Sequence, residues 1–196
     1  MTQFIGRLSK FAAGIVVVIL LSGCVSTRIG ISYTPQTNAV PVIGAARVPV
    51  SVDVKDGRLK NYVGTVHISG GYTIDSAYTV VTTNDVLLVF KQAIEDELAR
   101  RGFTPSENGV TILVGLNEFY CDPAPASAIA AVSVQVRKSE RTIIYSKLVT
   151  AKGKNPHIRL DQGLRIQGAL DNALQNCMAQ LFADPKFISA LLNASG

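Results

Sequence analysis

The stretch NDVLLVFKQAIEDELARRGF, residues 84–103, decides the fold because it holds the clearest periodic pattern in the sequence. Its apolar residues recur at helical spacing, which predicts a helix with one buried face. Thr83 or Asn84 is the expected N-cap, with Asp85 in the first turn. Gly102 is expected to end the helix. The apolar face comprises Val86, Val89, Phe90, Ala93, Ile94 and Leu98.

Strands are predicted on both sides of this helix. Residues 47–55 and 110–119 alternate apolar and polar side chains, which is the period of a half-buried strand. Residues 129–136 and 142–150 alternate in the same way around a polar turn, which predicts an antiparallel hairpin. The remaining predicted elements are short strands at 62–68 and 77–82, a helix at 164–182 and a short helix that begins at Asp184-Pro185.

The order of these elements predicts the fold class. We expect one α+β domain over residues 47–196, with a mostly antiparallel sheet. Two main helices are expected to pack on one face of the sheet, followed by the short C-terminal helix. The length of the chain agrees with a single domain.

The N-terminus has the parts of a secretory signal peptide at residues 1–23. Arg7 and Lys10 precede eleven residues without charge, and the run is too short to span a bilayer comfortably. Leu-Ser-Gly-Cys, ending at Cys24, resembles the lipobox of bacterial lipoproteins. We therefore expect a lipid on the Cys24 thiol, since a thiolate is the natural nucleophile for alkylation. The alternatives are an ordinary signal peptide or a buried N-terminal helix with a chance cysteine.

The residues around this cysteine predict the location of the protein. Val25 follows Cys24 where an aspartate would oppose outer-membrane sorting, so we expect anchoring in the outer membrane, facing the periplasm. Residues 24–46 are nearly uncharged and are interrupted by proline and glycine, which predicts a lipidated N-terminus and a tether. Acyl chains would hold such a protein firmly on the membrane.

The charge of the chain argues against nucleic acid as a partner. Removing the leader leaves 17 Lys and Arg residues against 14 Asp and Glu residues, which is only mildly basic. The basic residues are concentrated in one segment, which could face an anionic partner. The alternative is the solvated rim of a hairpin. The residues are Arg137, Lys138, Arg141, Lys147, Lys152, Lys154, Arg159 and Arg165.

Two further cysteines, Cys121 and Cys177, remain in the mature chain. An envelope location permits a disulfide between them. The alternative is that both are small buried apolar residues.

Few residues suggest catalysis or metal binding. The chain has two histidines, His67 and His157, and their spacing does not predict a zinc site. No serine lies in a Gly-x-Ser-x-Gly frame. We therefore expect a protein that is not an enzyme and that carries no cofactor apart from the covalent lipid on Cys24.

Several of these features together resemble the YajG-like bacterial lipoproteins. The resemblance rests on the lipobox, on VPVSVDVKDGR at 48–58, on LLVFKQAIEDELARRGF at 87–103, and on the strand and C-terminal helix that follow. It implies a membrane-anchored periplasmic domain and no known catalytic residues.

The expected function is that of a non-enzymatic binding, scaffold or accessory module in the cell envelope. Such a module would present a sheet edge or the basic hairpin to an envelope protein. The alternative is a periplasmic carrier or sensor of a small amphiphile, such as a lipid or a cell-wall fragment, held between sheet and helices. The sequence assigns no oligomeric state.

Overall fold

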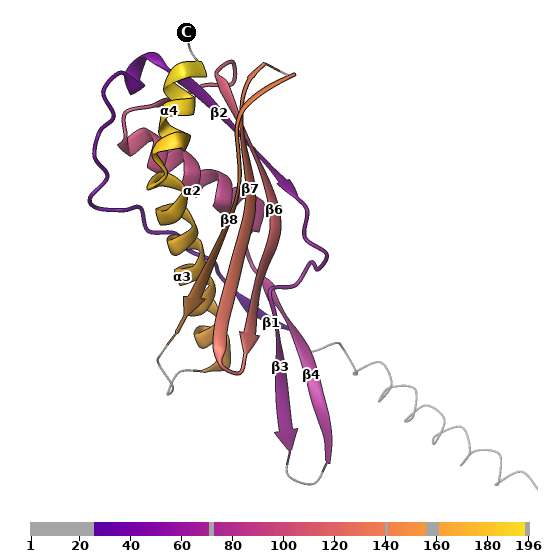
Figure 1. The fold of residues 1–196 in the computed structure, drawn as a ribbon. Helices are drawn as coiled ribbons and strands as arrows, with labels where there is room; N and C mark the ends of the chain where they lie inside the picture. Colours follow the sequence, from indigo (N-terminus) through magenta and orange to yellow (C-terminus); the bar gives the residue numbers. More distant parts are fainter. Residues whose placement is uncertain (1–25, 71–72, 140, 156–160, 195–196) are drawn as a thin grey trace, which may run out of the picture.

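The computed structural model describes residues 26–70, 73–139, 141–155 and 161–194, so Cys24 and Arg159 lie outside the described residues. The described part forms an α+β fold with three α-helices on an eight-stranded sheet, which confirms the predicted class (Figure 1). In chain order the elements are β1 Thr27–Ile29, the 3-10 helix η1 Ala45–Arg47, β2 Pro49–Asp56, β3 Gly64–Gly70, β4 Thr73–Thr82, α2 Val86–Arg100, β5 Thr104–Pro105, β6 Val110–Pro123, β7 Ala126–Ser139, β8 Thr142–Lys154, α3 Gln162–Phe182 and α4 Pro185–Ala194.

Strand β6 organises the sheet because it pairs along both of its edges. One edge pairs with β7 in an antiparallel ladder over almost its full length, and β8 extends this side. The other edge is shared, since β2 pairs parallel with residues 110–116 and β3 joins at Cys121 through Gly64. β4 and β1 continue from β3, and the β3–β4 pair extends beyond the foot of the main sheet (Figure 1). The longest pairings are therefore antiparallel.

The helices cover one face of the sheet and bury its apolar side chains (Figure 1). Alternate residues of β2, β6 and β7 point into this core, as the strand patterns predicted. Phe90 of α2 and Phe119 of β6 meet edge to face, with ring centroids 5.2 Å apart. The largest fully buried side chains are Phe90, Phe119, Phe187, Ile94, Leu98, Ile112, Leu116, Ile166, Leu170, Leu174, Met178 and Leu181.

The start of α2 differs from the expectation in one residue. Asp85 is the N-cap, and its carboxylate accepts a hydrogen bond from the Leu87 N–H at 2.8 Å. Asn84 instead bonds the backbone of Ile31 in both directions, at 3.0 Å and 2.7 Å. The helix ends as predicted, with Gly102 at a φ of +90°.

The connection between the strands predicted at 110–119 and 129–136 is much shorter than these bounds suggested. β6 continues through Pro123 and β7 begins at Ala126, so only Ala124 and Pro125 connect them. The Ala124–Pro125 peptide bond is cis. Both strands are therefore longer than the predicted 110–119 and 129–136.

The segment expected to be a tether packs against the domain over its described part. β1 pairs with β4, and Ile29 and Ile31 are 5% and 4% exposed. Ala45 and Val48 are also buried in the core. The proline and glycine residues of this segment had suggested a free chain. Its apolar side chains are instead buried in the core, because their removal from water is favourable.

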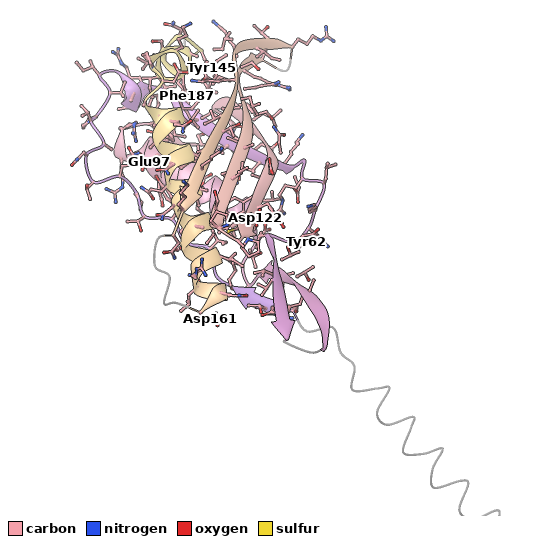
Figure 2. The ribbon with its side chains drawn as sticks, turned by 60° about the horizontal axis from the view of Figure 1, so that its bottom comes forward. Tyr62, Glu97, Asp122, Tyr145, Asp161 and Phe187 are labelled. Atoms are coloured by element: carbon pink, nitrogen blue, oxygen red, sulfur yellow. The ribbon has the colours of Figure 1, made fainter. Side chains whose placement is uncertain are left out.

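A buried carboxylate holds this segment on α2. Glu97 is fully buried and accepts hydrogen bonds from the Tyr33 hydroxyl at 2.6 Å and the Gln36 N–H at 2.8 Å. It also forms an ion pair with Arg101, whose guanidinium lies 4.4 Å from the centre of the Phe182 ring. Figure 2 marks Glu97 at this contact between α2 and the N-terminal segment.

The hydrogen bonds to Glu97 also set its protonation state. Burial alone would raise the pKa of this carboxyl group, because the charged form loses its hydration. The hydrogen bonds from Tyr33, Gln36 and Arg101 outweigh burial and hold the pKa below its ordinary value. Burial and the neighbouring carboxylate raise the pKa of Tyr33, so its hydroxyl remains a donor.

We predict that Glu97→Gln lowers the free energy of unfolding by about 3 kcal/mol, because it leaves the buried Arg101 charge unpaired. Glu95→Gln is the matched control on the same helix. Its partner Lys91 lies 3.8 Å away at the surface, so the loss should stay below about 0.5 kcal/mol. Chemical denaturation measures both. Equal losses in the two variants would contradict a special role for Glu97.

We further predict that Glu97 contributes to acid sensitivity. A depressed pKa means that the carboxylate stabilises the fold fully above the ordinary carboxyl pKa of about 4.3 and loses this effect as the pH falls. The pH range to test runs from pH 5 to pH 3, on either side of that ordinary pKa of about 4.3. Over this range the melting temperature should fall less steeply in Glu97→Gln than in the native protein. Thermal melts across this range test the difference, and parallel curves would refute it.

Candidate functional site

The predicted basic residues do not gather into one patch. They are distributed along the β7–β8 hairpin and α3, and Arg141 and Lys154 lie at opposite ends of β8, roughly 40 Å apart at about 3.3 Å per residue. Three of them lie on β8. Arg137 and Lys138 end β7, Arg141 lies in the turn, Lys147, Lys152 and Lys154 lie on β8, and Arg165 lies in α3.

β8 forms an edge of the sheet, since β7 is its strand partner in the described residues. Its odd-numbered residues face β7 with their backbone groups, and the Asn155 N–H continues this row by donating to Ala126 O. The backbone N–H and C=O groups of the even-numbered residues point away from β7. The carbonyl groups of Lys152 and Lys154 show this, since each accepts a hydrogen bond from an asparagine of α3. The N–H and C=O groups of a strand residue point the same way.

Helix α3 covers only the second half of this edge. Asn176 caps the Lys152 carbonyl at 2.8 Å and Asn172 caps the Lys154 carbonyl at 2.9 Å. The helix lies so close that a Cβ at Gly153 would stand 2.1 Å from the Ala169 carbonyl oxygen. Glycine therefore permits this direct backbone approach.

The first half of the edge remains open. Ser146, Leu148 and Thr150 direct their N–H and C=O groups outward, and no described residue hydrogen-bonds these groups. Leu148 is 61% exposed. Ile143 and Ile144 are also exposed, so apolar side chains accompany the unpaired backbone. This combination is the usual template for adding another strand.

A groove of about 700 Å³ runs between residues 144–147 of β8 and helix α4. Tyr145 and Phe187 pack at its base with ring centroids 5.5 Å apart, and Figure 2 shows them next to each other. The lining residues are Ile144, Tyr145, Ser146, Lys147, Asp184, Pro185, Lys186, Ser189, Ala190 and Asn193.

Asp184 joins the two walls of the groove. Its carboxylate caps α4 by accepting the Lys186 N–H at 2.9 Å. The same group accepts hydrogen bonds from β8, from Lys147 Nζ at 2.7 Å and from the Tyr145 hydroxyl at 3.1 Å. The hydrogen bond from Lys147 is the main cause that lowers the pKa of Asp184. Burial raises the pKa of Tyr145, so its hydroxyl stays protonated and donates.

The two cysteines of the described domain are free thiols. Cys121 on β6 and Cys177 on α3 are both fully buried, and no disulfide joins them. Burial raises the pKa of each thiol to about 12, which leaves both protonated at neutral pH. They act as small apolar residues of the core, the alternative that the sequence had left open.

Two further observations concern chemistry and membranes. The described ranges contain no group of three or more His, Cys, Asp and Glu side chains that could hold a metal ion. Within the same ranges, no helix has the length and apolar character needed to cross a bilayer.

The sequence analysis singled out the lysines of the hairpin as candidate binding residues. It missed the capping asparagines and the groove that distinguish the two halves of β8. Nothing in the spacing of Asn172 and Asn176 indicates that they cap a strand edge 18 and 24 residues away. The short helix at Pro185 was predicted, but its position beside β8 depends on tertiary packing.

Comparison with solved structures supports the fold. The chain is similar to protein XCC0632 from Xanthomonas campestris, described under the family DUF330, with a TM-score of 0.54 and 12% identity over 80% of this chain and 92% of that one. A second structure, described as an uncharacterized protein, has a TM-score of 0.47 and 10% identity over 78% and 96% of the two chains. At such identities the likeness to XCC0632 shows the fold alone. A comparison with curated proteins gives no match.

A family model described as "Uncharacterized lipoprotein" matches residues 35–192. The match spans β2 to α4 and includes the open edge of β8, the groove and the buried Glu97. It confirms the resemblance inferred from the sequence. The chain therefore belongs to this family of uncharacterized, YajG-like lipoproteins.

Proposed function

We propose that the protein is a lipid-anchored, non-enzymatic binding module of the outer membrane, facing the periplasm. Its partner is an extended, acidic segment of another envelope protein. This segment adds as a strand to β8 between Ser146 and Thr150 and lies along the groove beside α4.

The observation that carries this proposal is the change in β8 halfway along its length. The carbonyl groups of Lys152 and Lys154 are capped by α3, whereas the backbone groups of Ser146, Leu148 and Thr150 have no partner among the described residues. Main-chain hydrogen bonds supply affinity in strand addition, and neighbouring pockets supply specificity. The groove meets the open half at Ser146 and Lys147, so both elements of this mode of recognition occur next to each other.

The positions of the lysines support a binding edge rather than a protected one. Lysines on an edge strand commonly prevent unwanted pairing. Lys152 and Lys154 occur where α3 already covers the backbone, and Lys147 is paired with Asp184. The open half therefore keeps Leu148 as its most exposed apolar side chain.

Charge favours an acidic segment as the occupant. The ion pair with Lys147 neutralises Asp184, which leaves the exposed Lys186 in the groove wall. Arg137, Lys138 and Arg141 lie at the turn just beyond this end of β8. Complementary charge accelerates encounter and selects the partner more than it adds affinity.

The sequence and the family support the proposed location. The family is one of lipoproteins, and the predicted leader, residues 1–23, is followed directly by Cys24 of the Leu-Ser-Gly-Cys motif. Val25 at the next position supports the outer membrane as the destination. Anchoring would concentrate the module near partners in the same envelope.

The core supports a binding module over a carrier of a small amphiphile. A carrier would need space between sheet and helices. There, residues such as Ile112 and Val114 of β6 and Leu170 and Leu174 of α3 are fully buried against one another.

We predict that photo-crosslinking residues at Ser146 and Thr150 capture one discrete envelope protein in intact cells. The controls are Leu88 of α2 and Leu164 of α3, which are 51% and 52% exposed and lie outside the open half of β8. Mass spectrometry should place the partner's crosslinks within one short acidic segment. The same adducts from all four positions would contradict a specific edge.

A proline substitution separates backbone pairing from side-chain contact. Leu148→Pro removes an outward N–H that the fold does not use, and edge strands tolerate proline there. It should reduce the Ser146 adduct at least tenfold, whereas Leu148→Ala should retain most of it. Circular dichroism verifies folding, and Thr150→Pro serves as a second variant if Leu148→Pro misfolds. Adducts that survive proline would exclude strand addition.

A further inference from the structure

A second cavity lies on the opposite edge of the sheet from β8, where β2 and β3 share the edge of β6. β2 ends at Asp56 and β3 begins at Gly64, and the intervening residues leave the sheet. β6 has a register shift between Leu116 and Glu118 at the same level. Such bulges redirect side chains and are common next to functional sites. The loop and the bulge enclose a cavity of about 270 Å³, lined by Arg58, Leu59, Lys60, Tyr62, Asn117, Glu118, Phe119 and Tyr120.

Two tyrosine rings and a lysine form one wall of this cavity. Tyr62 and Tyr120 meet edge to face with ring centroids 6.2 Å apart. The Tyr120 hydroxyl lies 3.1 Å from the Thr65 hydroxyl, which fixes this ring against β3. Lys60 Nζ lies 4.7 Å from the centre of the Tyr120 ring and 5.5 Å from that of Tyr62. The rings therefore hold the ammonium group at the cavity. Figure 2 shows Tyr62 near the foot of the main sheet, close to Asp122.

Arg58 supplies a second cation with an unused hydrogen-bond donor. Its Nε and Nη2 atoms bond the two oxygens of Asp56 at 2.9 Å and 2.8 Å. The side chain is 11% exposed, and its Nη1 atom is buried without a hydrogen-bond partner among the described residues. A buried donor without an acceptor carries a free-energy cost that a ligand atom would relieve.

The charges around the cavity restrict the ligand to a single negative charge. Asp56 neutralises Arg58, and the exposed Glu118 at the rim opposes any further anion. Lys60 is the cation of this lining that no described carboxylate pairs, so a monoanionic carboxylate fits better than a doubly charged phosphate. One of its oxygens can accept from Lys60, and the other can accept from Arg58 Nη1 once a movement of the lining uncovers this buried atom.

The size and the apolar surface define the rest of the ligand. A cavity of 270 Å³ lies just below the usual range of about 300–1,000 Å³ for drug-sized ligands, so it admits only a small group. Leu59 is fully exposed beside the tyrosine rings and offers an apolar contact.

We infer that this cavity binds a carboxylate that carries a short apolar group. Two sources share this chemistry, the C-terminal residue of a peptide and a short free carboxylic acid. The site is separate from the β8 edge and does not depend on the function proposed for that edge.

Titration of the full mature chain with N-acetyl-leucine tests the inference by NMR. We expect saturable changes in the amide signals of residues 58–62 and 117–120. N-acetyl-leucinamide, which lacks the carboxylate, should bind at least tenfold more weakly. Equal binding of acid and amide, or no change at these residues, would overturn the inference. A titration with pentanoate distinguishes the two sources of the carboxylate. If pentanoate binds as tightly as N-acetyl-leucine, the ligand is a free acid, and if it binds more weakly, the ligand is the C-terminal residue of a peptide.

Variants of two lysines test the geometry. Lys60→Met keeps the length of the side chain and removes its charge, and it should weaken N-acetyl-leucine at least fivefold. Lys55→Met on the neighbouring strand is the matched control, since Lys55 is a solvent-exposed surface lysine outside the cavity lining, and it should leave the affinity unchanged. Equal effects of the two substitutions would indicate only a general attraction between charges and would refute the site.

Discussion

The fold depends on the requirement that β6 satisfy its backbone hydrogen bonds along both edges. Buried backbone groups must be paired, and β6 spans 14 residues through the centre of the sheet. β7 satisfies one edge continuously, but the other edge needs two shorter strands, β2 and then β3. The loop between them closes the carboxylate cavity at their junction. The antiparallel pairing of β6, β7 and β8 places β8 at the opposite edge, where the backbone groups of Ser146, Leu148 and Thr150 are unpaired among the described residues.

Helices determine how much of that outer edge remains open. α3 crosses the second half of β8 at Gly153 and caps two of its carbonyl groups. α4 instead stands off the first half and is joined to it through Asp184. On the other side of the domain, Glu97 fixes the N-terminal segment to α2, so that segment contributes Ile29 and Ile31 to the core. The surface available to a partner is thus the part of the sheet edge that no helix or segment covers.

Local patterns in the sequence were enough to predict most of the elements. The apolar period of residues 86–98 and the alternating valines of β2 and β7 record which side chains are buried, and burial on one face defines both element type and fold class. The tether prediction failed because proline and glycine describe local stiffness and give no information about whether Ile29 meets the core. The cap prediction differed because Asn84 is engaged by Ile31, a residue 53 positions away.

The binding features could not be predicted because they arise from contacts between distant residues. The basic segment was visible, but the sequence does not show that Lys147 is neutralised by Asp184 or that asparagines of α3 reach β8. Similarly, Arg58 and Tyr120 line the same cavity only because β2 and β3 both pair with β6. The sequence supplied the residue types, and the topology determined which of them share a surface.

Amide hydrogen exchange along β8 tests the central claim that half of this edge is open. In the free protein the N–H groups of Ser146, Leu148 and Thr150 should exchange quickly, whereas those of Tyr145, Lys147 and Val149 should be protected by β7. This alternation would establish an intact strand with an unpaired outer side. Uniform protection would show that the edge is already covered, and uniformly fast exchange would show that the strand is not stably formed. Either of these two results would contradict the account.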